Sequence, residues 1–148
     1  RMTMARIANF ATGPLAKAPE KRKRDWGVRS KEHMAYLHSL ECAVTGMTND
    51  LTVQHIMAGR ETYGKKEDDN WTVPLGRTLH LHDYPDSLEK LGERNFWNRH
   101  GIDALALARD LWTLRETHGP VIAAGHEIIR AHRMLGQIRV RQGIKVFE

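Results

Sequence analysis

Cysteines and long apolar segments are scarce in this sequence. A single cysteine, Cys42, cannot form a disulfide within the chain, so the fold has to be stable without one. No segment approaches the roughly 20 consecutive apolar residues that cross a bilayer, and none has the apolar core of a secretion signal. These absences predict a cytoplasmic protein that makes no membrane contact.

The rest of the composition is typical of a globular protein. The chain has 148 residues, of which 41% are hydrophobic and 28% are charged. This length matches one compact domain with a buried core, and it excludes a large multidomain enzyme.

Positive charge is concentrated at both ends of the sequence. Residues 1–30 carry eight basic side chains and two acidic ones, and residues 130–148 carry five basic side chains and one acidic one. Because the whole chain has a net charge of +5, the segment between the two ends is acidic. Basic ends favour a polyanion such as nucleic acid, because each neutralised phosphate releases counterions. A tail that only keeps the protein in solution is the alternative.

Residues 1–29 are predicted to form a mobile basic arm. They show no sustained apolar period, and Lys21, Arg22, Lys23 and Arg24 form a block of like charges that repel one another. The compact part then begins at Ser30, which can cap a helix from Lys31 to about Leu40.

A β-hairpin is predicted after this helix. Its first strand would be residues 42–44, followed by a turn-rich segment and a second strand over residues 51–56. His55 would lie at the end of the second strand, where the chain leaves the sheet. A polar connection over residues 58–69 leads to a short β-like run, residues 71–75, and to a helix that begins at Arg77 and stops before Pro85.

Three further helices are predicted in the second half of the chain. The first begins at Asp86, has a capping-box Glu89 and ends at Gly101. The second runs from Ala104 to about Arg115 behind an Asp103 cap, and the third covers residues 121–135 and ends at Gly136.

Polar residues stand at three joints between these elements. They are the pair Gln54-His55, the run Asp68-Asp69-Asn70 and the pattern His80-x-His82. In this order and spacing the residues resemble the HNH nuclease family, which has the ββα-metal fold, and more narrowly its phage recombination-type branch. The resemblance implies an α+β fold in which an HNH-like ββα-metal unit is embedded in a mostly helical single domain.

The resemblance covers about residues 30–115. The matching segments are Cys42-Ala43-Val44-Thr45, Val53-Gln54-His55-Ile56, residues 69–80, residues 92–97, residues 101–103 and Leu111-Trp112. It implies a nuclease domain over residues 30–115, with a C-terminal helix and basic end, residues 116–148, packed on it.

The zinc-binding cysteines of that branch are mostly absent. Of the four cysteines expected from the family, only Cys42 is present, and Thr45, Gly76 and Leu79 occupy the other three places. None of these three can bind zinc as a thiolate does, so no structural zinc is expected. Cys42 is then expected to be a small core residue.

The resemblance also implies roles for the polar residues. His55 matches the general base, and either Asn70 or Asp69 would orient its ring. Gln54, His80 and His82 match metal-ligand positions. A glutamine carbonyl is a weak ligand, and side chains two positions apart on a helix point about 200° apart, so His80 is favoured over His82.

These roles predict a metal-dependent endonuclease that hydrolyses DNA phosphodiester bonds. The cofactor would be one divalent ion, Mg²⁺ or Mn²⁺ in the first place and Zn²⁺ as an alternative. The resemblance implies a phage or prophage setting in a bacterial host cell, linked to recombination, with single-stranded or branched DNA as substrate. The block of residues 21–24 and Arg77 would bind phosphates. A catalytically degenerate DNA-binding relative and a purely structural helical protein are the alternatives, and the oligomeric state is open.

Overall fold

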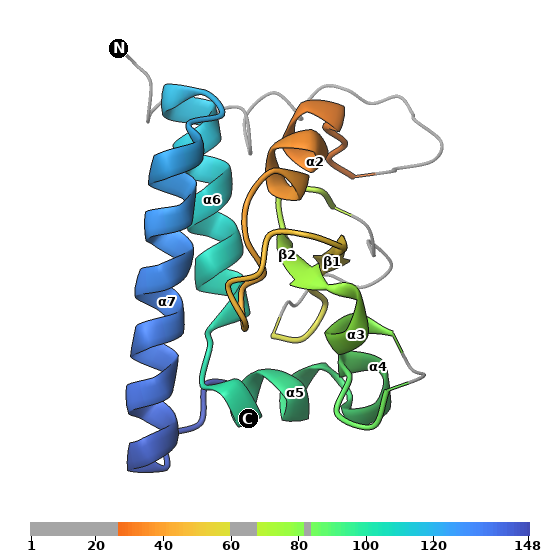
Figure 1. Ribbon diagram of the computed structural model, residues 1–148, viewed down its shortest axis with the longest axis vertical. Helices are drawn as coiled ribbons and strands as arrows, with labels where there is room; N and C mark the ends of the chain where they lie inside the picture. The colour runs from red at the N-terminus through yellow and green to blue at the C-terminus, as the bar shows by residue number, and fades with distance from the viewer. Residues whose placement is uncertain (1–26, 60–67, 82–83) are drawn as a thin grey trace, which may run out of the picture.

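The computed structural model describes residues 27–59, 68–81 and 84–148 (Figure 1). In these ranges the protein is an α+β domain with six helices and one two-stranded antiparallel sheet. The predicted arm lies outside the described residues except for residues 27–29. Those three residues belong to the domain, because Val28 exchanges hydrogen bonds with Asp68 and Asp69.

Helix α2, Lys31–His38, begins where the sequence predicts it. The Ser30 hydroxyl caps the helix by accepting a hydrogen bond from the His33 amide. Tyr36 and Leu37 lie on its buried face, which packs against the sheet and the helices behind it.

The sheet consists of β1, Leu51–His55, and β2, Thr72–Gly76, with His55 opposite Thr72. The predicted hairpin was therefore wrong in its first strand, since residues 42–44 form no strand and the partner of β1 follows it in the sequence. The 42–44 segment is instead tied into a local turn, in which the Cys42 amide donates to Met47 and the Gly46 amide to Cys42. It is linked to β2 by two hydrogen bonds: the Ala43 amide donates to the Pro74 carbonyl at 3.0 Å, and the Gly76 amide donates to the Cys42 sulfur at 3.3 Å.

Three short helices follow β2 directly. They are α3, Arg77–His80, α4, Leu88–Leu91, and α5, Glu93–His100. The single helix predicted from Asp86 to Gly101 was wrong, because Gly92 adopts a φ of +88° that breaks the helical path between α4 and α5. Ser87 rather than Asp86 is the cap of α4, and its side chain accepts from the Lys90 amide.

Two long helices complete the described chain. Helix α6, Ala104–His118, has the predicted Asp103 cap, and α7, Ile122–Gln142, continues seven residues beyond its predicted end. Gly136 does not end α7. It is buried, and a Cβ there would lie only 2.6 Å from the His100 carbonyl oxygen, so this glycine permits a close approach of α7 to the end of α5.

Helices α6 and α7 form one layer of the molecule. The sheet, α3 and α4 lie on the side of α6 that faces away from α7 (Figure 1). The core between them is built from fully buried apolar side chains of α2, β2, α5 and α6, among them Leu37, Leu75, Trp97, Leu107 and Leu111. No described helix is both long enough and apolar enough to traverse a bilayer.

Candidate functional site

His55, the last residue of β1, lies against Asp69 in the segment that precedes β2. Its Nε2 atom is 3.0 Å from Asp69 Oδ1. The Asp69 side chain is only 8% exposed, whereas that of His55 is 28% exposed. The carboxylate is therefore the inner partner of the pair, and one edge of the imidazole ring faces outward.

This contact determines which nitrogen of His55 can accept a proton. A carboxylate has no hydrogen to donate, so the hydrogen of this bond belongs to His55 Nε2. In the neutral ring the lone pair is then on Nδ1.

His80, the last residue of α3, is held in the opposite way. Its Nδ1 atom lies 2.7 Å from the Thr52 hydroxyl oxygen of β1. That hydroxyl donates its only hydrogen to the Leu75 carbonyl at 2.8 Å, so it must accept the bond from His80. The hydrogen of His80 is therefore on Nδ1, and the lone pair is on Nε2, where it can bind a cation.

The surroundings of His80 keep it in this neutral state. Burial lowers its pKa below the ordinary histidine value, the Glu89 carboxylate opposes this, and the neighbouring basic groups, including Arg77, lower the pKa further. A neutral imidazole is the form that binds metal ions.

The Gln54 side chain contacts Glu93 and the main chain of His55. Its Nε2 atom donates to Glu93 Oε2 at 3.0 Å and to the His55 carbonyl at 2.7 Å. The amide nitrogen is thus fixed, and Oε1 is the atom of Gln54 that is chemically suited to a cation.

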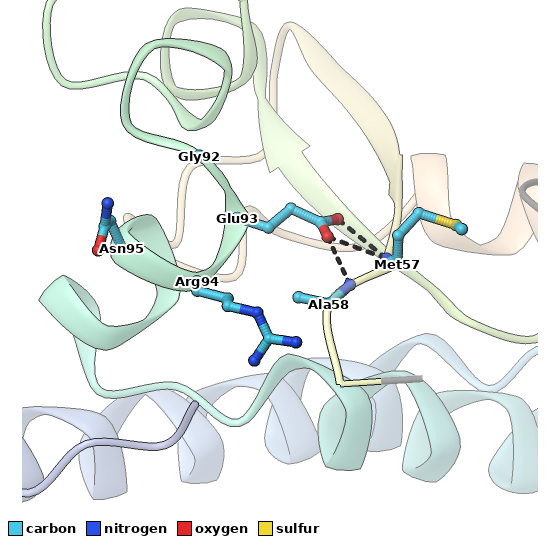
Figure 2. Close-up of a pocket in the computed structure, with 6 residues that line it drawn as sticks. All are labelled: Met57, Ala58, Gly92, Glu93, Arg94 and Asn95. Atoms are coloured by element: carbon cyan, nitrogen blue, oxygen red, sulfur yellow. Dashed lines mark hydrogen bonds between the residues drawn. The ribbon is translucent and has the colours of Figure 1, made fainter. Parts of the chain in front are cut away.

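Glu93 fixes the chain where it leaves β1. Its two carboxylate oxygens accept hydrogen bonds from the main-chain amides of Met57 and Ala58, as Figure 2 shows. These residues line an open pocket of about 430 Å³ together with Gly92, Arg94 and Asn95. Glu93 therefore sets the direction in which the strand end departs from His55.

The other predicted site residues are placed as follows. Asn70 follows Asp69, but its Oδ1 atom is buried without a hydrogen-bond partner in the described residues, so Asp69 is the residue that contacts His55. Arg77 begins α3 and pairs on the surface with Asp50 at 2.9 Å. His82 and residues 21–24 lie outside the described residues.

Cys42 is buried and accepts two main-chain hydrogen bonds at its sulfur. The donors are the amides of Thr45 at 3.4 Å and Gly76 at 3.3 Å. Thr45 and Gly76 occupy two of the places where the family has zinc-binding cysteines, and the fold brings both next to Cys42. Here the Cys42 sulfur accepts hydrogen bonds from their amides. The prediction of Cys42 as a small core residue is confirmed.

Thr52 and Glu93 belong to this site, but sequence reasoning did not find them. Thr52 precedes His55 by three residues on the same strand, and only the pairing of β1 with β2 brings it to Leu75 and His80. Glu93 appeared only as part of a matching segment, and its role depends on a contact across 35 to 39 residues. No local pattern signals either contact.

Comparisons with protein-family models, with characterised proteins and with solved structures find no match to this chain. Within the described ranges, no three His, Cys, Asp or Glu side chains form a group that would hold a metal ion by themselves. The site is therefore defined by its own geometry: two histidines, one at the end of β1 and one at the end of α3, each with one nitrogen fixed and the other carrying a lone pair.

Proposed function

We propose that the protein is an HNH-type endonuclease that hydrolyses DNA phosphodiester bonds with His55 as general base. The observation that carries this proposal is the His55–Asp69 pair, in which the carboxylate is buried and the imidazole ring is partly exposed. The order of β1, β2 and α3, with histidines at the ends of β1 and α3, supports it.

The chemical task of His55 is to take a proton from the attacking water. Nδ1 carries the lone pair for this step, because Nε2 donates to Asp69. The positive ring that results faces a buried carboxylate, and this lowers the free energy of the charged state. Asp69 acts as a positioning residue, since its contact is with His55 and not with the reacting atoms.

His80 and Gln54 each keep one atom that could bind a divalent ion. His80 offers Nε2 and Gln54 offers an amide oxygen, because the other atoms of these groups are held by Thr52, Glu93 and the main chain. The amide oxygen suits Mg²⁺ or Mn²⁺, which keep several waters and contact phosphate oxygens, and the imidazole nitrogen suits Mn²⁺ or Zn²⁺. When bound, such an ion would polarise a phosphoryl oxygen and stabilise the leaving oxygen.

The charge distribution supports a nucleic acid as substrate. The block of residues 21–24 and the exposed Arg77 provide positive charge that can contact phosphates without reading base sequence. The resemblance to the phage recombination-type branch favours single-stranded or branched DNA and a phage or prophage origin.

A DNA-binding protein that has lost catalysis is the second candidate. It is favoured by Gln54, which stands where the family has an aspartate or histidine and whose amide nitrogen is held by Glu93. In this candidate His55 and His80 would retain their hydrogen bonds without any hydrolysis.

A cleavage assay separates the two candidates. Supercoiled plasmid and single-stranded DNA are incubated with the full chain and Mg²⁺, Mn²⁺ or Zn²⁺, beside His55→Ala and His132→Ala. His132 pairs with Asp110 between α6 and α7, so it is a matched histidine outside the site. The proposal expects cleavage by the parent and by His132→Ala, and loss of at least about 100-fold in His55→Ala. Tight, salt-sensitive binding without cleavage under every metal would favour the second candidate.

A further inference from the structure

Residues 27–30 cross directly over Asp68 and Asp69, from the other end of the described sequence. The Val28 amide donates to Asp68 Oδ1 at 2.9 Å, and the Asp69 amide donates back to the Val28 carbonyl at 2.8 Å. The Ser30 amide then donates to Asp69 Oδ2 at 2.7 Å. Three hydrogen bonds thus join two segments that are about forty residues apart in the sequence.

The Ser30 contact divides the two oxygens of Asp69 between two partners. Oδ1 faces His55 and Oδ2 faces Ser30, so rotation of the carboxylate is blocked on both sides. Ser30 is itself fixed as the N-cap of α2, because its hydroxyl accepts from the His33 amide. The orientation of the His55 ring therefore depends on the position of the segment that enters α2.

Gly27 has no room for a side chain at the start of this segment. Its φ of +77° lies in the region that favours glycine, and a Cβ there would overlap Asp68 Oδ1. Such a Cβ would displace the Asp68 carboxylate, which is the acceptor for Val28. In the sequence, Gly27 stands three residues after Arg24, the last residue of the basic block 21–24.

We propose that residues 27–30 are a positioning element of the His55 site, which holds Asp69 in the orientation that His55 requires. The inference rests on the proposed function in that His55 is taken as the base. It goes further because it assigns to the segment after the basic block a direct part in setting the base. Displacement of this segment would free the Asp69 carboxylate and leave the His55 Nε2 hydrogen without a fixed acceptor.

The test compares alanine substitutions at two glycines that have similar positive φ angles, so both substitutions strain the backbone to a similar extent. Gly27→Ala adds a Cβ against Asp68, whereas Gly143→Ala adds one at a φ of +71° with nothing within 4 Å. A second pair, Asp68→Ala and Asp68→Asn, removes or keeps the oxygen that accepts from Val28. All four variants are made in the full chain.

The first readout is the proton NMR signal of the His55 Nε2 hydrogen, assigned by its loss in His55→Ala. A hydrogen held by a carboxylate exchanges slowly with water and resonates far downfield. We expect this signal in the parent, Gly143→Ala and Asp68→Asn, and its loss in Gly27→Ala and Asp68→Ala. The second readout is cleavage, where kcat should fall about tenfold in Gly27→Ala and Asp68→Ala with little change in KM.

The result that overturns the proposal is a His55 signal that persists in Gly27→Ala while the Val28 amide signal moves. That outcome would show a displaced segment and an unaffected pair. The NMR readout does not depend on hydrolysis, so a parent that never cleaves DNA but shows the expected signals would overturn the proposed function and leave the positioning element in place.

Discussion

Two histidine–aspartate pairs in this protein have almost the same length but opposite surroundings. His55–Asp69 joins β1 to the segment before β2 at 3.0 Å, and His132–Asp110 joins α7 to α6 at 2.8 Å. In the first pair the carboxylate is 8% exposed and the imidazole 28%, whereas in the second the carboxylate is 44% exposed and the imidazole 15%.

The difference shows why a histidine–carboxylate contact alone does not mark a site. In the His132 pair the ring is the inner partner, so it can stabilise helix packing but presents no open edge to a substrate. In the His55 pair the carboxylate is inside, so the ring is oriented by a buried partner while the ring itself is partly exposed. The order of burial, rather than the distance, distinguishes the two regions.

The largest expected effect comes from changing the carboxylate of each pair to an amide. In Asp69→Asn the amide oxygen must accept from Ser30, so the NH₂ group faces His55 Nε2. His55 Nε2 would then have to accept, its hydrogen would move to Nδ1, and the base would be blocked. We predict a fall in cleavage rate of about 10² to 10⁴-fold. Asp110→Asn should leave the cleavage rate unchanged. Equal losses in both variants would show that the order of burial does not distinguish the two pairs.

The next largest effect is expected from Glu41, which joins the segment after α2 to α7. Glu41 is buried and lies 2.6 Å from Arg133, 2.8 Å from His126 and 3.3 Å from Arg130, all on α7. Glu41→Ala removes the common partner of these groups, so we predict a loss of about 3 kcal/mol in the free energy of unfolding. Urea unfolding measures this loss. Cleavage per folded molecule should stay at the parental level, because the His55 pair makes no contact with this cluster.

A smaller effect is expected from His33, which is fully buried in α2 and accepts a hydrogen bond from Arg115. Burial, followed by the charge of Arg115, lowers its pKa from 6.5 to about 4, and Asp69 opposes this. The unfolded chain therefore binds a proton before the folded one. Stability is independent of this group above pH 6.5 and falls as the pH decreases toward 4.

Between pH 7 and pH 5 this difference corresponds to about 2 kcal/mol. Urea unfolding at the two pH values should show this loss in the parent. The loss should shrink in His33→Gln, whose side-chain oxygen can still accept from Arg115. An identical pH dependence in both proteins would assign the effect to other groups.

The smallest effect on stability is predicted for Arg77. Its ion pair with Asp50 is exposed on both sides, so Arg77→Gln should change the free energy of unfolding by less than about 1 kcal/mol. If Arg77 contacts phosphate, the same variant should weaken DNA binding uniformly across sequences and reduce its salt dependence. Arg109→Gln, a surface arginine of α6 that lies 3.9 Å from Asp110, is the matched control. Fluorescence anisotropy at two salt concentrations measures both variants.

Local signals in the sequence were sufficient for much of the fold. The Ser30 and Asp103 caps and the strand ending at His55 follow from short-range patterns, and the structure has them at these positions. The errors concern contacts between distant segments. Gly136 was predicted to end α7, but a glycine is needed there because the end of α5 lies so close to the helix. The strand that pairs with β1 is β2, which begins after sixteen intervening residues.

The candidate site divides in the same way. His55 and His80 were proposed because the order and spacing of the motifs resemble those of the HNH family, and Asp69 was one of two adjacent candidates for the contact with His55. Thr52, Glu93 and the Ser30 amide could not be found, because each acts through a hydrogen bond across 28 to 39 residues. Their partners are set by strand register and helix placement, which no short sequence pattern encodes.

The central claim is that His55 and His80 have their hydrogens on opposite nitrogens, so that one offers a base and the other a ligand. Long-range proton–nitrogen NMR spectra of the ¹⁵N-labelled full chain at pH 8.5, assigned with His55→Ala and His80→Ala, measure this directly. We predict the Nε2–H form for His55 and, for His80, the Nδ1–H form that a free histidine side chain populates less. A His80 ring in the Nε2–H form would contradict it.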